Sequence, residues 1–308
     1  MPAAYLAQHE SGELATRIER ALGTLRECRL CPHECRVDRT AEKWGRCRTG
    51  RKALVSSVGP HFGEEEPLVG RGGSGTIFLA SCNLACIFCQ NYDLSQLGHG
   101  RPADAAFLAR AMVGLQKHGC ENINFVTPTH VLPQLLEALP EAVEKGLRVP
   151  LVWNCGGYES LESLALLEGI VDIYMPDLKY ADAATAERLS GVRDYPARAF
   201  AAVREMHRQV GDLALDERGV ATRGLLVRHL VLPQGLAGTA EVMRFLGAVS
   251  PNTYVNVMAQ YRPCHRAHEE ARLTRGLTTA EYRQAVQAAR NAGLTRLDAR
   301  PLERMGIV

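Results

Sequence analysis

From residue 76 onward, short apolar or β-branched runs alternate with longer segments whose apolar residues recur at helical spacing. The runs are "TIFLASC", "NINFVTP", "PLVWNCG", "VDIYMPDLK", "GLLVRHLVLP" and "NTYVNVMAQY". Strands that alternate with helices predict a parallel sheet, and nearly continuous apolar strands predict burial on both faces. Six such units predict an α/β fold, a partial (β/α)6 TIM-type barrel. The helices are expected at residues 103–117, 132–145, 159–168, 182–189, 196–210, 238–248 and 279–292.

The chain before residue 76 has a different pattern. Leu14, Ile18, Leu22 and Leu25 recur at helical spacing after Ser11, which predicts an amphipathic helix with a serine N-cap. Few long apolar segments follow, so residues 28–75 are expected to be loop-rich. The sequence therefore predicts two parts: a helix with a small cysteine-rich metal-binding module over residues 1–55, and the barrel over residues 56–308.

Composition narrows the class of protein. Of 308 residues, 46% are hydrophobic and 23% are charged, which is typical of a globular protein and argues against a disordered one. The chain has no apolar run near the length of about 18 residues that a membrane span requires. His9, Glu10 and Glu13 interrupt the place of a signal peptide. A cytoplasmic protein with no membrane partner is expected.

Ten cysteines in a reducing compartment do not predict disulfides. Seven of them fall into two tight groups, which indicates metal binding. The first group is Cys28, Cys31, Cys35 and Cys47, in a C-x2-C-x3-C-x11-C pattern. Four thiols complete the coordination of one zinc ion, a rubredoxin-like iron or an additional iron–sulfur cluster. The sequence favours zinc or a single iron, and His33 is a weaker candidate ligand.

The second group, Cys82, Cys86 and Cys89, has only three thiols in a C-x3-C-x2-C pattern. Three thiolates ligate three irons of a [4Fe–4S] cluster and leave the fourth iron open. A structural zinc site is the alternative, but zinc usually takes four protein ligands there. The open iron is then free to bind a further molecule.

This motif after a first strand resembles the signature of the radical S-adenosylmethionine (SAM) superfamily. Longer runs resemble its pyruvate formate-lyase activating enzyme-like branch, namely "HFGEEEPLVGRGGSGTIFLASCNLACIFCQNYDLSQ", "NINFVTPTHVLPQLLEAL", "VDIYMPDLKY" and "QYRPCH". The resemblance implies an oxidoreductase whose open iron chelates SAM and whose reduced cluster cleaves it to a 5′-deoxyadenosyl radical, which abstracts a hydrogen atom. It further implies a glycyl radical enzyme as the partner, and flavodoxin or ferredoxin as the electron donor.

Strand periodicity and the resemblance together indicate a SAM site. Asp177 and Lys179 share one strand face, and Arg228 points inward while His229 faces the other way. In the family the acid of the "DLK" triplet also helps to hold a monovalent cation. "VTPTH" stands where the superfamily usually has a Gly-Gly-Glu stretch that contacts the amino group of SAM. In this chain threonine oxygens would make that contact. The residues expected to contact SAM are Phe88, beside the adenine, with Asn91, Thr127, Thr129, Asn154, Asp177, Lys179 and Arg228.

Two further thiols, Cys155 and Cys264, fall at or beyond strand ends. Near the substrate a thiol could donate a hydrogen atom; the alternative for each is a small apolar filler. His130 is equally compatible with a substrate contact and with the start of the next helix.

The partner and substrate stay open. Residues 17–52 carry eleven Arg or Lys against five Asp or Glu, which fits docking of an acidic protein, less so nucleic acid, or a solvated surface. Radical modification of a peptide, an RNA base or a small metabolite is one alternative to glycyl-radical activation. A non-catalytic iron–sulfur or redox protein is another.

Overall fold

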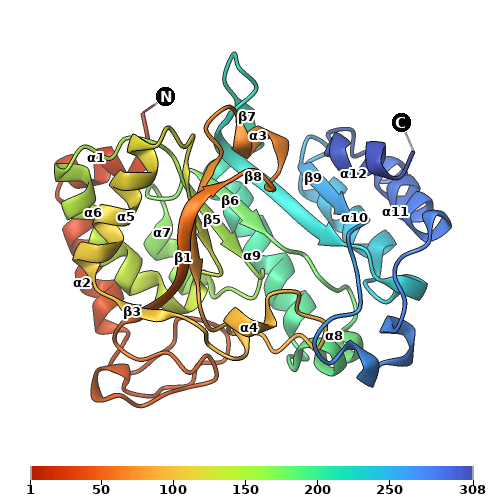
Figure 1. Ribbon diagram of the computed structural model, residues 1–308, viewed down its shortest axis with the longest axis horizontal. Coiled ribbons are helices and arrows are strands. Elements are labelled where there is room, and N and C mark those ends of the chain that lie inside the picture. Colours follow the sequence, from red (N-terminus) through yellow and green to blue (C-terminus); the bar gives the residue numbers. More distant parts are fainter. Residues whose placement is uncertain (1, 307–308) are drawn as a thin grey trace.

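The computed structural model describes residues 2–306 as a mixed α/β structure around a nine-stranded sheet (Figure 1). Six strands are parallel and follow one another across the sheet in chain order. The predicted strands and parallel sheet are thus confirmed, while the partial barrel itself stays a prediction. The six are β2 (Ser74–Leu79), β4 (Ile123–Val126), β5 (Leu151–Cys155), β6 (Ile173–Pro176), β8 (Ala221–Leu230) and β9 (Tyr254–Met258).

Three more strands extend this sheet in antiparallel directions. β1 (Ala53–His61) pairs with β2 and with β3 (Arg101–Ala103), and β7 (Ala214–Leu215) pairs with β8. Residues 28–75 were expected to be loop-rich, and β1 is a regular strand within them that the sequence did not predict. This strand buries only part of its length, and its second half is polar and largely exposed, so it gives a weak hydrophobic pattern.

Helices cover the flanks of the sheet, with α2, α5 and α6 on one side and α10 and α11 on the other (Figure 1). The seven predicted helices are all present. The last begins with the capping box of Thr278 and Glu281. Within residues 2–306, no helix has both the length and the apolar character to cross a membrane. The helices that follow the parallel strands are α5 (Ala105–Lys117), α6 (Leu132–Glu144), α7 (Leu161–Leu167), α8 (Ala183–Ser190), α9 (Tyr195–Val210), α10 (Thr239–Val249), α11 (Thr279–Asn291) and α12 (Ala299–Arg304).

The amino-terminal segment begins with two helices where one was predicted, α1 (Ala4–Glu10) and α2 (Glu13–Gly23). Ser11 is not the N-cap of the predicted helix, because it follows α1, and Gly12 with a φ of 80° precedes α2. A left-handed residue of this kind favours glycine. Both helices contact α6, so they belong to the helical layer, and the boundary at residue 55 stays a prediction.

The core has two parts, one on each face of the sheet. Tyr174 packs with the helical layer, whereas its neighbours Ile173 and Met175 point to the other face. There they pack with Leu226 of β8 and with Leu68 of the short helix α3 (Glu66–Val69). This second cluster fills the inner face toward the strand beginnings. The carboxyl ends of the strands therefore remain available for polar side chains.

Candidate functional site

The three cysteines of the C-x3-C-x2-C motif lie on one loop, residues 82–89, between β2 and α4 (Tyr92–Ser95). We call it the three-cysteine loop. Each sulfur has at least one hydrogen-bonding partner, and such bonds stabilise thiolates and tune iron–sulfur clusters. The Leu84 amide donates to Cys82 Sγ over 3.3 Å, the Ser190 hydroxyl donates to Cys86 Sγ over 2.9 Å, and Ser95 Oγ lies 3.1 Å from Cys89 Sγ.

A cavity of about 280 Å³ opens beside this loop, at the carboxyl ends of the parallel strands. This volume is close to the lower end of the range of about 300 to 1,000 Å³ for small-molecule sites. Its lining combines the thiols with charged and apolar groups. The predicted site residues that line it are Cys82, Cys86, Phe88, Cys89, Asn91, Thr127, Asn154, Cys155, Asp177, Lys179 and Arg228.

The charged wall of the cavity is one connected network. The Asp177 carboxylate accepts a bond from Lys179 Nζ at 2.6 Å and another from Arg228 Nε at 2.8 Å. Arg228 Nη2 also donates to Asn154 Oδ1 at 2.8 Å. Period-two alternation in β6 and β8 positions these groups, because Ile173 and Leu226 on the same faces point inward.

Ionisation of this network is fixed by its own charges. Burial alone would raise the pKa of Asp177, but the positive charges of Arg228 and Lys179 outweigh it and hold that pKa below its usual value. Burial likewise opposes the charge of Lys179, yet Asp177 raises its pKa above the usual value. The cavity therefore presents a fixed carboxylate between two fixed cations at neutral pH.

Two acids beneath the network were not assigned a role from the sequence. Glu64 Oε2 lies 3.6 Å from Arg228 Nη1, and Glu65 Oε1 accepts a bond from Asn256 Nδ2 at 2.8 Å. Burial raises the pKa of Glu65, against the opposing effect of Arg228. Both acids precede α3, and their run "EEEP" resembles a solvated loop. The sequence does not show that these two acids are buried, because their burial depends on the long-range path of β1.

Three predicted residues lie elsewhere or have other partners. Thr129 is buried and donates its hydroxyl to Glu159, so it does not supply a free oxygen to the cavity. Cys264, in the loop after β9, is absent from the cavity lining as described. His229 is buried and points away from the cavity. Its ring nitrogens lie 2.6 Å from Leu178 O and 2.9 Å from Thr239 Oγ1, as expected of a packed residue.

Cys155 is the one extra thiol of the two that lines the cavity. It is buried, and burial raises its pKa well above the usual value. Glu159 lies behind it, close enough for its charge to affect that thiol. Burial raises the pKa of Glu159 to about 7, despite the bond from Thr129. A neutral thiol and a carboxyl that titrates near neutrality thus stand side by side.

The four amino-terminal cysteines also come together, around a separate cavity of about 10 Å³. Arg39 and His130 line the same cavity. His130 therefore faces this group and not the larger cavity, where it was considered as a substrate contact. Among the described residues, no group of three or more His, Cys, Asp or Glu side chains is arranged so that it could hold a metal ion, and this applies to both cysteine groups.

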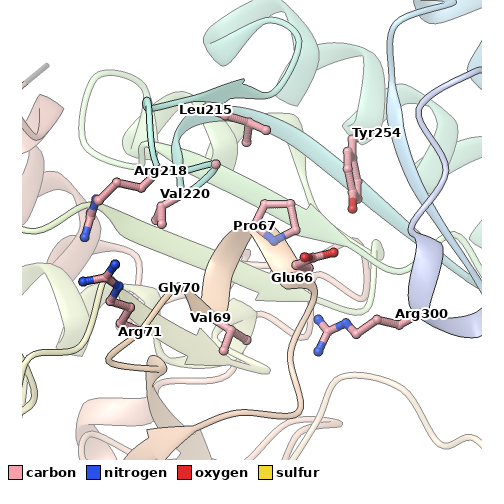
Figure 2. A pocket seen from close by; sticks show the side chains of 11 residues that line it. Glu66, Pro67, Val69, Gly70, Arg71, Leu215, Arg218, Val220, Tyr254 and Arg300 are labelled. Carbon is pink, nitrogen blue, oxygen red and sulfur yellow. The ribbon is translucent and has the colours of Figure 1, made fainter.

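A third and larger cavity, of about 650 Å³, lies at the opposite end of the strands, beside α3 and the starts of β8 and β9. Figure 2 shows Arg71 and Arg218 on one side of it and Arg300 on the other. Arg218 is paired with Glu121 at 2.9 Å and with Asp216. This cavity has no thiol in its lining, so it is not where the cysteine chemistry takes place.

Comparison with known proteins gives a relative that is similar over most of the chain. No family model matches the chain. Among similar solved structures is a radical SAM methyltransferase from Sphaerobacter thermophilus. It has 15% identity over 71% of this chain and 64% of that one, with a TM-score of 0.44. Another is TsrM from Kitasatospora setae, a radical S-adenosylmethionine methyltransferase with cobalamin and a [4Fe-4S] cluster bound, which has 17% identity over 61% of this chain and 37% of that one, with a TM-score of 0.45. The chain thus spans less than two thirds of either, and similarity this low decides neither fold nor function.

The relative is the uncharacterized protein MJ0674 of Methanocaldococcus jannaschii, with 33% identity over 291 residues. The match covers 91% of this chain and 79% of the relative. Only 9% of the chain lies outside the match, so the match extends over both cysteine groups or ends within a few residues of the first. The chain belongs to the same family as MJ0674 of M. jannaschii.

Proposed function

We propose that this chain is a radical SAM enzyme, which holds a [4Fe–4S] cluster on the three-cysteine loop and SAM in the adjoining cavity. One observation carries the proposal: three thiols, each with a hydrogen-bonding partner, line a cavity whose wall is the network of Asp177, Lys179 and Arg228. A redox protein that only carries electrons has no need of an organic-ligand cavity. The network thus favours an enzyme over a non-catalytic iron–sulfur protein.

The residues fit the groups that they would hold. When bound, the cluster supplies the electron that cleaves SAM and gives a 5′-deoxyadenosyl radical. The methionine end of SAM carries one carboxylate and one ammonium, and the cavity offers both complements. Arg228 and Lys179 attract the carboxylate, while Asp177 attracts the ammonium or a monovalent cation. Asn154 holds Arg228 in place through a bond of 2.8 Å.

The other walls of the cavity suit the rest of the ligand. Phe88 is buried and meets Tyr261 edge-on, with ring centroids 6.0 Å apart. Its ring, with Leu230 and Met258, gives an apolar surface for the adenine. Thr127 has a left-handed φ of 62°, and its amide donates to Asn154 O at 2.8 Å. This leaves its side chain at the cavity, while Asn91 and Gln90 stand at the exposed rim.

The substrate is the finer part of the proposal. Glycyl-radical-enzyme activation follows from the sequence resemblance, and the basic segment of residues 17–52 suits docking of an acidic protein. A small metabolite, a peptide or an RNA base fits the cavity equally well. Transfer of deuterium from labelled candidates into 5′-deoxyadenosine distinguishes these substrates.

The test of the class is SAM cleavage by the anaerobically reconstituted and reduced full chain. Wild type and Cys120→Ala are expected to form 5′-deoxyadenosine, detected by mass spectrometry, whereas Cys86→Ala forms none. Cys120 is the matched control, because it is buried but lines neither cysteine cavity. Formation of 5′-deoxyadenosine by Cys86→Ala at the wild-type rate would contradict the assignment of the cluster ligands.

A further inference from the structure

The amino-terminal cysteines surround a cavity of their own, lined by Cys28, Cys31, Cys35 and Cys47. We propose that they bind a single metal ion of the zinc or iron class through four thiolates, and that this ion holds residues 28–47 against the three-cysteine loop. The inference is independent of the proposed function, because it concerns different ligands. Four observations support it.

The first observation is a buried charge. Arg39 is 1% exposed, and its guanidinium donates to Gly50 O at 2.9 Å and to Cys28 Sγ at 3.8 Å. No carboxylate forms an ion pair with it in the part of the chain that the structure describes. A buried charge normally requires an opposite charge nearby. Four thiolates around one divalent ion carry an excess of about two negative charges, which is the partner that Arg39 lacks.

The second observation is the close approach of the backbone to Cys35. The Arg46 amide donates to Cys35 Sγ at 3.4 Å. This approach requires Gly45, because a Cβ atom there would lie 2.7 Å from the same sulfur. Amide bonds to sulfur stabilise a thiolate and are typical of thiolate metal sites. The backbone at Gly45 and Arg46 is therefore shaped to lie close to this sulfur.

The third observation is an unpartnered nitrogen. His130 is 1% exposed, and its Nε2 must donate to Ala80 O, 2.9 Å away, because a carbonyl oxygen only accepts. Nδ1 then carries a lone pair, and it has no partner among the described residues. The same imidazole lines the cavity of the four cysteines. The boundary of this cavity therefore lacks a polar partner, and this observation points to an occupant of the cavity.

The fourth observation is the size of the space. The cavity measures about 10 Å³, close to the ~10–15 Å³ that one water-sized occupant needs. This space corresponds to about one small occupant, and a single ion would require less rearrangement of the four side chains than a four-iron cluster. As described, the four side chains do not form a group that could hold a metal ion, so the proposal requires their sulfurs to move closer together on binding.

The segment is joined to the three-cysteine loop through His33. Its Nε2 lies 2.7 Å from Asn83 O, and Asn83 in turn donates from Nδ2 to Tyr158 O at 2.8 Å. The rings of His33 and Tyr158 meet edge-on with centroids 5.2 Å apart. His33 lies between Cys31 and Cys35, so an ion on those ligands would fix its position. Occupancy of one site thus orders the loop of the other.

The test uses the full chain with Cys82, Cys86 and Cys89 all replaced by alanine, which removes the other thiol site. Zinc, iron and acid-labile sulfide are measured in the purified protein. We expect about one zinc or one sulfide-free iron per chain, lost on adding Cys47→Ser and kept on adding the control Cys120→Ser. No metal, or iron accompanied by equal sulfide, would overturn the proposal. If the ion stays while wild type fails to cleave SAM, only the proposed function fails.

A second variant avoids changing a ligand. Arg39→Met removes the buried charge, and loss of such an outer partner typically weakens metal binding about 10- to 100-fold. The control is Arg36→Met, between the same cysteines but exposed. Zinc affinity is measured by competition with a chromophoric chelator. Equal affinity of Arg39→Met and wild type would overturn the charge argument, whereas the metal content of the Cys47→Ser variant decides the site itself.

Discussion

The two cysteine regions differ in what surrounds the sulfurs. The three-cysteine loop borders a cavity of about 280 Å³ with a carboxylate and two cations in its wall. The four-cysteine segment surrounds only about 10 Å³, and its one buried charge is the cation Arg39. The first region has a cavity close in volume to small-molecule sites, whereas the second has space for about one water-sized occupant. The two sites thus differ both in the space beside their thiols and in the number of thiols, three in one and four in the other.

The largest expected effect, after loss of a cluster ligand, is at Asp177. In Asp177→Asn, Lys179 and Arg228 lose the carboxylate that both contact. Asp177 is the group proposed to attract the SAM ammonium, and loss of a hydrogen bond to a charged group costs about 1.5 to 3 kcal/mol, so SAM affinity should fall by about 10- to 100-fold. Equilibrium dialysis of the reconstituted protein measures it, and the metal content of the four-cysteine segment should not change.

The control for this variant is Asp182→Asn. Asp182 caps α8 through a bond of 2.7 Å from the Thr185 amide, and asparagine caps a helix about as well as aspartate. SAM affinity of the control should match wild type. If Asp177→Asn also matches wild type, the network is not part of the ligand site, and the contrast between the two regions is lost.

A second effect concerns Glu159, on the segment that contacts both regions. The folded protein holds its proton up to about pH 7, whereas the usual value is 4.5. Its contribution to the free energy of unfolding is thus complete below pH 4.5 and is lost as pH rises through 7. Glu159→Gln should remove this loss, which is on the order of 3 kcal/mol.

Chemical denaturation at pH 5 and at pH 8 measures this effect. The wild type should lose stability between the two values, while Glu159→Gln should lose much less. The control is Glu162→Gln, exposed on the neighbouring turn, which should retain the wild-type pH dependence. A wild type that has the same pH dependence as Glu159→Gln would contradict a raised pKa for Glu159 in the fold.

The smallest effect is at the junction of the two regions. His33→Ala removes the bond to Asn83 O, worth about 1 kcal/mol, and should speed amide exchange in residues 82–89 by about 5-fold. Hydrogen exchange with mass spectrometry measures it, with His9→Ala on α1 as the control. Unchanged exchange would mean that the four-cysteine segment does not order the three-cysteine loop.

Much of the cavity could be predicted from local patterns. Period two fixes which residues of a strand share a face, so Asp177, Lys179 and Arg228 were placed together and His229 apart from them. The three-cysteine loop followed from its position after the first parallel strand. These inferences needed only the sequence around each residue and the rule that the carboxyl ends of parallel strands lie at the same edge of the sheet.

The remaining features depend on long-range packing. Glu64 and Glu65 are buried because β1 carries them beneath Arg228, and no local pattern shows that. His130 and Thr129 follow a cavity strand but turn into the layer behind it, toward the four cysteines and Glu159 respectively. The burial of Arg39 likewise depends on how residues 28–52 fold back. Sequence periodicity does not describe such loops.

The central claim is that the cluster on the three-cysteine loop keeps one iron free for SAM. The most direct measurement is the electron paramagnetic resonance spectrum of the reconstituted, reduced protein before and after SAM is added. The account predicts a four-iron signal that changes when SAM binds, and no such change in Asp177→Asn at the same SAM concentration. A four-iron signal in wild type that is identical with and without saturating SAM would contradict it.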